Sequence, residues 1–191
     1  LATLQTDDRF ILFLSTPEDD IFGEVPEFIQ KVVLLKKNVP LSKIVTSQIL
    51  LPAKCAKMKV DLVYYQGNFV SLMQTSPKVL AIRSMLQYYF PEAISFGRRV
   101  YRKALTPLKS ADRIIVPSAS TRDDVCKFLH VRKEKIFVIP HGIDLDYFGT
   151  ALPKEVVNTT LSSIGISRPY LLFVSALWPY KGADLLITAY H

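Results

Sequence analysis

The chain has 191 residues, of which 49% are hydrophobic and 11% aromatic, and its formal net charge is +7. This composition predicts one good-sized folded domain and part of a second, and it excludes a disordered chain. Residues 78–135 hold 13 basic and 5 acidic side chains and so carry the whole positive excess. Such a patch suits an anionic partner: nucleotide phosphates, an acidic glycan, an anionic membrane or nucleic acid.

Several other classes of protein do not fit the sequence. Cys55 and Cys126 are isolated thiols, each expected to be a small core residue, and no Cys or His spacing typical of a metal site occurs. No apolar run reaches the roughly 18 residues of a membrane span and no signal peptide is visible, so we expect a cytoplasmic protein. Leu1 is not methionine and helical spacing runs to His191 without a stop signal, so both ends are expected to be cut.

Short apolar runs alternate with helical spacing over the first 140 residues. The runs predict strands at 9–14, 29–35, 61–65, 78–82, 113–116 and 135–139. Helical spacing covers 41–57, where Pro52 should break or bend the helix, and 92–109. Ser120 and Asp123 have the spacing of a capping box and predict a helix that runs to Leu129. Apolar strands separated by helices predict a parallel sheet covered on both faces.

The pattern changes after Pro140. A turn is expected at 141–144, a short helix near 154–163, a new strand at 169–174 and a new helix at 181–191. We interpret residues 1–145 as a first α/β domain, 146–168 as a linker and 169–191 as the truncated start of a second α/β domain. One strand and one helix cannot bury a core alone.

Residues that directly follow the strands are the candidate ligand contacts, because parallel sheets bind ligands beyond the carboxyl ends of their strands. They include Arg83, Ser118, 141–144 and 175–181. The seven glycines form neither G-x-G-x-x-G nor a P-loop, and no G-x-S-x-G elbow occurs. A nicotinamide cofactor, a Walker-type ATPase and a hydrolase triad are therefore disfavoured.

Three ordered segments carry the most specific motifs. They read ADRIIVPS over 111–118, VIPHGID over 138–144 with Phe148 after it, and PYKG over 179–182 after an apolar run. In order and spacing they resemble glycosyltransferase family 4. Its members carry an AD-x-hydrophobic-hydrophobic-x-x-S strand, a V-I-P-x-G-[VI]-D-x-x-x-F hinge and a P-x-K-G loop into a helix. The resemblance covers 111–191 by motif and 1–110 by topology.

The resemblance implies the GT-B architecture of two Rossmann-like domains. Residues 1–145 would be the N-terminal, acceptor-side domain without its first strand, and 169–191 the start of the donor-binding domain. The implied activity moves a hexosyl group from a nucleotide-diphosphate sugar to a glycan or lipid-linked acceptor in surface polysaccharide synthesis. Transfer would retain the anomeric configuration and need neither a metal nor a cofactor.

The resemblance also assigns residues. Lys181 matches the lysine that contacts the donor diphosphate, and Gly182 beside it permits close backbone approach. Gly142 and Asp144 match the hinge, where the glycine is expected to allow an unusual backbone angle and the aspartate to cap a turn. The family's pair of glutamates would lie beyond His191, so no catalytic residue is assigned and this chain alone is expected to be inactive.

Two positions depart from the family pattern. Ala176 stands where many members have a second phosphate-binding arginine, and Arg83 stands where they have a histidine. Arg83 cannot act as a base but can clamp a phosphate or carboxylate. This role and a surface salt bridge both remain open for Arg83, as do ligand contact and a capping role for Ser118.

Other interpretations remain beside this one. The basic helix 95–109 is either a solvated face or a contact with anionic lipid at the inner face of the membrane. The chain could instead be a non-catalytic nucleotide-sugar-binding module, or another GT-B enzyme such as an epimerase or a phosphorylase. Nucleic acid is disfavoured because aromatic side chains are not interleaved with the basic ones.

Overall fold

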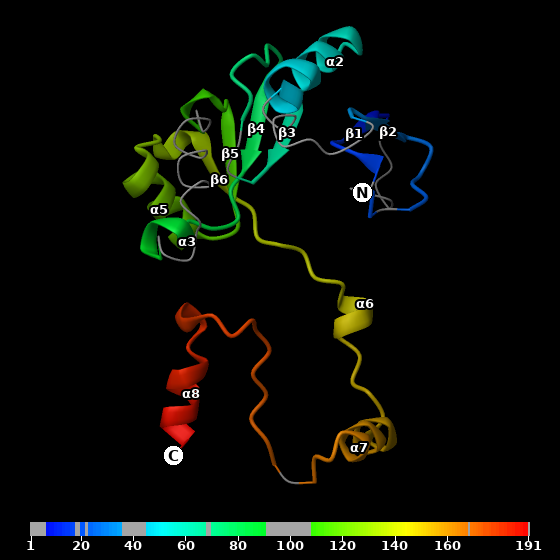
Figure 1. Ribbon diagram of the computed structural model, residues 1–191, viewed down its shortest axis with the longest axis vertical. Coiled ribbons are helices and arrows are strands. Elements are labelled where there is room, and N and C mark those ends of the chain that lie inside the picture. The colour runs from blue at the N-terminus through cyan, green and yellow to red at the C-terminus, as the bar shows by residue number, and fades with distance from the viewer. Residues whose placement is uncertain are drawn as a thin grey trace. The chain divides into compact units, whose positions relative to one another are not determined.

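The computed structural model describes residues 7–17, 20–21, 23–35, 45–67, 70–90, 108–167 and 169–190. The chain divides into two compact units, Leu1–Pro140 and His141–His191 (Figure 1). The first unit contains all the strands of the described residues, and the second contains helices joined by irregular segments. Of the expected helix at 92–109, residues 92–107 lie outside the described ranges.

A four-stranded parallel sheet forms the centre of the first unit. Its strands are β3 (Val63–Gln66), β4 (Lys78–Ala81), β5 (Arg113–Val116) and β6 (Ile136–Val138), which lie side by side in chain order. The register places Val63 opposite Lys78 and Ile114 opposite Ile136. The predicted parallel α/β arrangement is therefore confirmed, and the carboxyl ends of all four strands lie at one edge.

The apolar runs become strands because their side chains fill the core. Leu80, Ile82, Ile114 and Val116 have at most 1% of their surface exposed. The edge strands behave differently, since Tyr64 in β3 and residues 137–138 in β6 are exposed. The expectation that the sheet is covered on both faces thus holds for the central strands and fails at the edges. Cys55 is fully buried and Cys126 packs against the same core, as expected of small core residues.

A separate pair of parallel strands lies near the start of the chain. β1 (Phe10–Leu14) pairs with β2 (Ile29–Val33), with Phe10 opposite Ile29. The segment between them is fixed by the ammonium group of Lys31, which forms an ion pair with Asp20 at 2.7 Å and also donates to the carbonyl oxygen of Gly23. Both predicted strands are confirmed.

One helical segment precedes β3 and changes its winding at Pro52. From Val45, the first described residue of the segment, it runs as the π-helical turn η2 (Thr46–Leu50) and continues as α2 (Leu51–Lys57), and residues 41–44 of the expected helix lie outside the described ranges. The N–H of Leu51 donates to the carbonyl oxygen of Thr46, five residues back. Pro52 has no N–H to donate and its ring crowds the preceding turn, which favours such widening. The helix is therefore rewound at Pro52 and not broken.

The helix that follows β5 begins two residues before its predicted start. α5 (Ala119–Leu129) has Ser118 as its N-cap, whose Oγ accepts a hydrogen bond from the N–H of Thr121 at 3.1 Å. The predicted capping role of Ser120 is wrong, because Ser118 already stands in extended backbone directly after β5. Ser120 lies inside the first helical turn and is exposed.

Aromatic side chains fasten the short helix α3 (Leu86–Tyr89) to α5. The ring of Tyr88 stacks on Phe128 with centroids 4.9 Å apart, and Tyr89 meets the same ring edge-on at 5.2 Å. The hydroxyl of Tyr89 donates to the carboxylate of Asp124, and this hydrogen bond raises the pKa of Tyr89. The 3₁₀ turns η4 (Leu108–Ser110) and η5 (Lys133–Lys135) precede β5 and β6.

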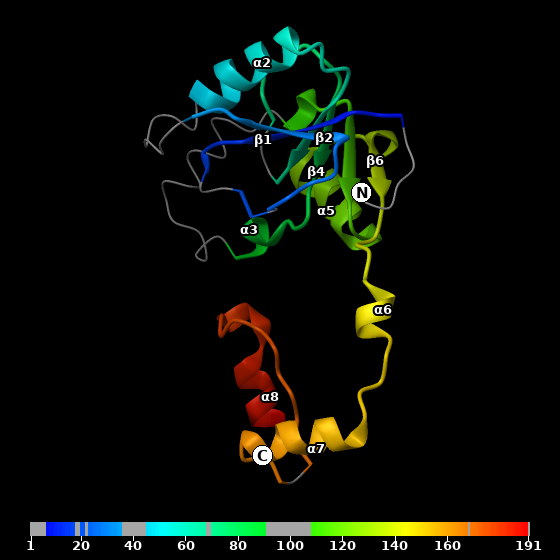
Figure 2. The same ribbon diagram turned by 90° about the vertical axis from the view of Figure 1, so that its right-hand side faces the viewer.

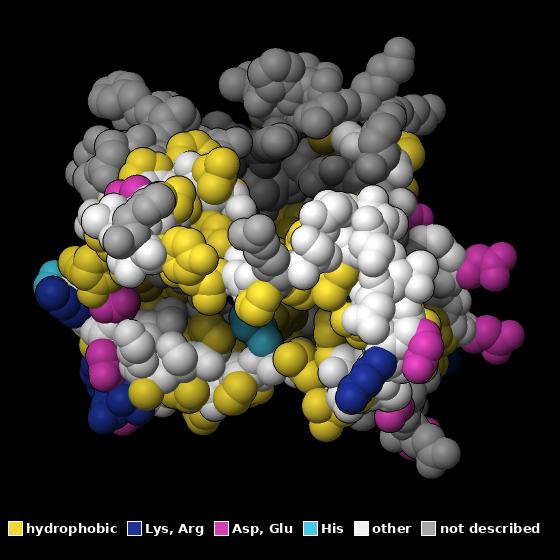
Figure 3. Space-filling model, turned by 90° about the horizontal axis from the view of Figure 1, so that it is seen from below, with side chains coloured by type: hydrophobic (Ala, Val, Ile, Leu, Met, Phe, Trp, Pro, Cys, Tyr) yellow, Lys and Arg dark blue, Asp and Glu magenta, His cyan; other side chains and the backbone are white. Residues whose placement is uncertain are grey.

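The second unit has no buried core among its described residues. It contains α6 (Leu145–Phe148), α7 (Lys154–Ser163), the 3₁₀ turn η6 (Pro179–Lys181) and α8 (Ala183–Tyr190). None of its described side chains is buried, and Figure 3 shows how much of the surface seen from below is apolar. The helix expected at 154–163 is confirmed. The strand expected at 169–174 is wrong, because these residues form no strand and the described residues after His141 offer none that could pair with them.

Candidate functional site

The carboxyl edge of the four-stranded sheet brings Arg83 and Ser118 onto neighbouring strands. Ala81 lies opposite Ile115, and the N–H of Ile82 donates to the carbonyl oxygen of Ile115 at 2.9 Å. Arg83 is two residues past Ala81 and Ser118 is three past Ile115. The two candidate residues therefore lie at the same edge, where parallel sheets bind their ligands.

Arg83 presents an exposed guanidinium group at this edge. Of the two ion pairs found in the described part of the chain, Lys31–Asp20 and Arg122–Asp123, neither involves Arg83. The surface salt bridge considered for Arg83 is thus absent from the described residues. Its five N–H donors match the paired oxygens of a phosphate or carboxylate.

Ser118 is half-buried and is occupied by its capping role. Its Oγ accepts from the N–H of Thr121 and lies 3.1 Å from the Oγ1 of that residue. The free N–H groups of the first turn of α5 therefore lie next to Ser118 at the same edge as Arg83. Ligand contact by Ser118 stays a prediction, whereas its role as a cap is established.

Lys181 and Gly182 occupy a tight junction between η6 and α8. The N–H of Lys181 donates to the carbonyl oxygen of Trp178 at 2.9 Å, and Gly182 ends the 3₁₀ turn with φ 74°. That angle is in the left-handed region, which glycine adopts without strain. The first helical bond of α8 runs from the N–H of Leu186 to the carbonyl oxygen of Gly182 at 3.0 Å. The N–H groups of residues 183–185 consequently have no partner within the helix.

The charges at this junction have opposite signs. The side chain of Lys181 is exposed, and its Nζ lies 5.5 Å from the centre of the Tyr180 ring. Asp184 stands in the first turn of α8, where its carboxylate is favourable to the helix dipole. An anionic ligand would meet an ammonium group and free N–H groups beside one carboxylate. The ammonium group and the N–H groups can bind the oxygens of an anion such as a diphosphate, and the carboxylate of Asp184 opposes them.

The hinge residues differ in how they match expectation. Asp144 caps α6, because its Oδ1 accepts from the N–H of Tyr147 at 3.0 Å. Gly142 is not among the residues with positive φ, so the unusual backbone angle expected there is wrong. The glycine lies two residues after the boundary between the units, and an added Cβ would meet nothing within 4 Å.

A polar contact that sequence reasoning missed connects the helix before β3 to the loop after it. The Oε1 of Gln48 accepts from the N–H of Leu72 at 3.0 Å and from the hydroxyl of Ser71 at 3.4 Å. The Nε2 of Gln48 and the Oε1 of Gln74 are buried without a hydrogen-bond partner. A polar side chain in a helical pattern gives no signal of such a contact, because its partner is 24 residues away.

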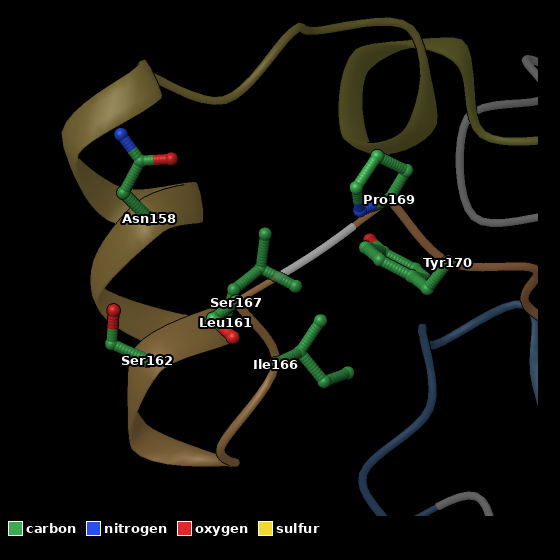
Figure 4. Close-up of a pocket in the computed structure, with 7 residues that line it drawn as sticks. All are labelled: Asn158, Leu161, Ser162, Ile166, Ser167, Pro169 and Tyr170. Atoms are coloured by element: carbon green, nitrogen blue, oxygen red, sulfur yellow. The ribbon is translucent and has the colours of Figure 1, made fainter.

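The described residues also contain a shallow hollow of about 540 Å³ in the second unit (Figure 4). Asn158, Leu161 and Ser162 of α7 line it together with Ile166, Ser167, Pro169 and Tyr170. None of these side chains is charged, and none is a predicted site residue, so the described lining of the hollow offers no cation to a diphosphate. Across the described ranges no three His, Cys, Asp or Glu side chains gather in a way that could bind a metal.

Two further predictions concern regions outside these sites. Arg98, Arg99, Arg102 and Lys103 of the predicted basic helix 95–109 lie outside the described residues. No helix within the described ranges is long and apolar enough to cross a membrane.

Comparison with curated proteins identifies two partial relatives. Alpha-maltose-1-phosphate synthase of Mycolicibacterium smegmatis is 28% identical over 131 residues, which cover 65% of this chain and 34% of that protein. D-inositol 3-phosphate glycosyltransferase of Kineococcus radiotolerans is 28% identical over 82 residues, which cover 43% of this chain and 19% of that protein. The chain thus spans about a third or less of the length of these relatives.

The fold and a family model agree with these relatives. A glycosyltransferase from Rickettsia africae has the same fold, with a TM-score of 0.59 at 14% identity over 97% of this chain and 57% of that one. The model of glycosyltransferase family 4 matches residues 7–147, including the stretch before residue 111 where only the topology carried the resemblance. Since the match covers well over half of the residues, this chain belongs to glycosyltransferase family 4.

Proposed function

We propose that this protein transfers a hexosyl group from a nucleotide-diphosphate sugar to a glycan or lipid-linked acceptor, with retention of the anomeric configuration. The proposal places the reaction in surface polysaccharide synthesis. The observation that carries it is the junction at Lys181 and Gly182, where an exposed ammonium group precedes three free helix N–H groups. Family membership supplies the reaction class.

The chemistry of this junction fits the leaving group of the reaction. As the glycosidic bond to the donor breaks, negative charge builds on the diphosphate and positive charge on the sugar ring. Lys181 and the N–H groups of residues 183–185 would stabilise that negative charge without a metal ion. A charge-assisted contact of this kind contributes about 1.5–3 kcal/mol.

The acceptor side rests on Arg83. An exposed guanidinium group at the carboxyl edge, without an ion pair among the described residues, favours an acceptor with a phosphate or carboxylate group. Both curated relatives carry a phosphorylated sugar or cyclitol in their names. An anionic acceptor is therefore the more specific form of the proposal, and Ser118 at the same edge is the second residue expected to contact it.

The location of the protein belongs to the same proposal. A lipid-linked acceptor would place the enzyme at the inner face of the membrane, and the basic stretch 95–109 would supply the cations that meet anionic headgroups. Release of the protein from membranes by salt would support this contact. Fractionation that does not change with salt would contradict it.

Donor binding tests the central claim. The full-length protein is screened by thermal shift against hexoses linked to uridine, guanosine, adenosine and thymidine diphosphates. One of them should raise the melting temperature, since a ligand that binds only the folded state stabilises it. Lys181→Ala should lower the affinity for that sugar nucleotide roughly 10- to 150-fold, the equivalent of one charge-assisted contact.

Lys154→Ala is the matched control, because Lys154 is an exposed lysine at the start of α7 in the same unit. Its affinity for the donor should equal that of the wild type. If Lys181→Ala binds as tightly as this control, or if no sugar nucleotide stabilises the protein, the proposed function fails. The 191-residue chain by itself is expected to show no transfer.

A further inference from the structure

The outward face of the helical segment before β3 carries apolar side chains. An exposed helix face ordinarily carries acidic and basic side chains. The exposed side chains of this segment are Val45, Ile49, Ala53, Lys54, Ala56 and Lys57. The exposed fraction is 39% for the valine and 51% for the isoleucine. In Figures 1 and 2, α2 lies at the outer margin of the first unit. The large apolar side chains of Val45 and Ile49 are thus followed by lysines toward the end of the helix.

The loop after β3 extends this apolar surface. Its backbone is tied to the helix by Gln48, whose Oε1 accepts from the N–H of Leu72. The side chains of Leu72 and Met73 point outward, with exposed fractions of 62% and 60%. The four large side chains Val45, Ile49, Leu72 and Met73 form what we call the helix–loop patch.

The charged side chains of the helical segment and of the loop after β3 have one sign. Residues 45–60 and 70–78 contain four lysines and no aspartate or glutamate, and the first carboxylate after the helix is that of the exposed Asp61. A second copy of the chain is a poor occupant of the patch, because pairing two such faces would bring lysines together with no carboxylate to neutralise them. A partner with an apolar interior and negative charges at its surface would match both the apolar side chains and the lysines.

We propose that the helix–loop patch docks on an anionic lipid membrane, with the segment 45–57 lying along the headgroup region. The large apolar side chains enter the boundary between headgroups and acyl chains, while the lysines reach the lipid phosphates. This surface is separate from the basic stretch 95–109, and its docking does not require the transferase reaction. The loop begins at the carboxyl end of β3, the edge that also holds Arg83 and Ser118.

Vesicle flotation with the full-length protein tests the proposal. Vesicles of phosphatidylcholine are compared with vesicles that also contain about 30% phosphatidylglycerol, which carries the anionic charge. The wild type should float with the anionic vesicles and much less with the neutral ones. Ile49→Asp and Leu72→Asp should each lower the partition coefficient about tenfold or more, since they remove an inserted side chain and add a repelled charge.

Ile21→Asp is the matched control, because Ile21 is 84% exposed and belongs to the segment between β1 and β2, not to the helix–loop patch. Its partition should equal that of the wild type. Lys54→Gln and Lys57→Gln leave the apolar side chains in place and should each lower the partition coefficient about fivefold. Circular dichroism and the unfolding midpoint show whether each variant is folded. If an aspartate variant does not fold, flotation of the lysine variants tests the docking in its place.

Three results would overturn the proposal. Unchanged flotation of Ile49→Asp and Leu72→Asp would mean that the patch does not meet lipid. Equal flotation with neutral vesicles would remove the role of the lysines. If Arg98→Gln and Arg99→Gln lose flotation while the patch variants keep it, the membrane contact belongs to the basic stretch 95–109 instead. Each of these outcomes is independent of donor binding, so it leaves the proposed function to its own test.

Discussion

Replacing Ser118 by alanine should destabilise the first unit by removing the cap of α5. The Oγ of Ser118 accepts from the N–H of Thr121 at 3.1 Å, and the serine is half-buried, so water replaces this contact poorly. Loss of an N-cap hydroxyl costs about 1 kcal/mol of the free energy of unfolding, within a range of about 0.5–2. In a unit of this size that lowers the melting temperature by about 4 °C.

Ser120→Ala is the comparison that gives this measurement its meaning. Ser120 is exposed in the first turn of α5, and alanine is the better helix former, so the variant should be as stable as the wild type or slightly more stable. Urea unfolding followed by circular dichroism, with an unchanged m-value, reports both differences. If Ser120→Ala costs as much as Ser118→Ala, the helix is capped at Ser120 and the reasoning is refuted.

A third variant separates the cap from a ligand contact. Aspartate caps a helix as well as serine does, so Ser118→Asp should restore the stability lost in Ser118→Ala. It also places a negative charge at the edge that holds Arg83. Binding of an anionic acceptor should therefore weaken in Ser118→Asp although the unit stays folded. An acceptor that binds this variant as tightly as the wild type would remove Ser118 from the acceptor site.

The remaining predictions concern the core. Leu80→Ala should lower the free energy of unfolding by about 2–5 kcal/mol, because Leu80 is fully buried in β4. Leu62→Ala should change it by less than about 0.5 kcal/mol, since that side chain is 53% exposed. Equal effects of the two variants in urea unfolding would contradict the placement of the core. Burial is the main cause that raises the pKa of Tyr65 to about 12, and Cys55 adds to it, while hydrogen bonds with Ser71 act in the opposite direction. An unfolded tyrosine ionises near pH 10, so the free energy of unfolding should fall between about pH 10 and 12. This fall should be smaller in Tyr65→Phe. An unchanged slope in Tyr65→Phe would show that the phenol ionises freely in the folded chain.

The four-stranded sheet could be predicted from the sequence because its signals are local. Each of its strands is a short apolar run, and Pro117 and Pro140 follow the last two, where the missing N–H stops the ladder. The same runs are apolar on both faces, which is why the parallel pairing could be predicted as well. The α5 helix was predicted for the same reason, but two hydroxyls stand near its start, and the position of the end of β5 decided which of them caps it.

Contacts between distant residues could not be predicted in this way. The hydrogen bond from Leu72 to Gln48 joins a helix to an irregular crossover, and neither segment shows a pattern that names the other. The run 169–174 has the composition of a strand, yet a strand exists only where a neighbour completes its ladder. For Gly142 the resemblance to the family's hinge motif suggested a special backbone angle, but this glycine is not among the residues with positive φ.

Donor binding at the junction of Lys181 and Gly182, as proposed above, depends on a helix that the second unit stabilises only weakly. Lys181 stands directly before a set of free helix N–H groups only while α8 is formed, and α8 has eight residues with no buried side chain. A helix of that length is marginal in water by itself, because nucleation is costly and packing normally stabilises it. An affinity that needs the formed helix is reduced by the fraction of molecules in which it is formed. The affinity of the protein for the donor should therefore be higher where packing holds α8 in its helical form than in the 191-residue chain, and an equal affinity in both would mean that Lys181 binds the diphosphate without the helix.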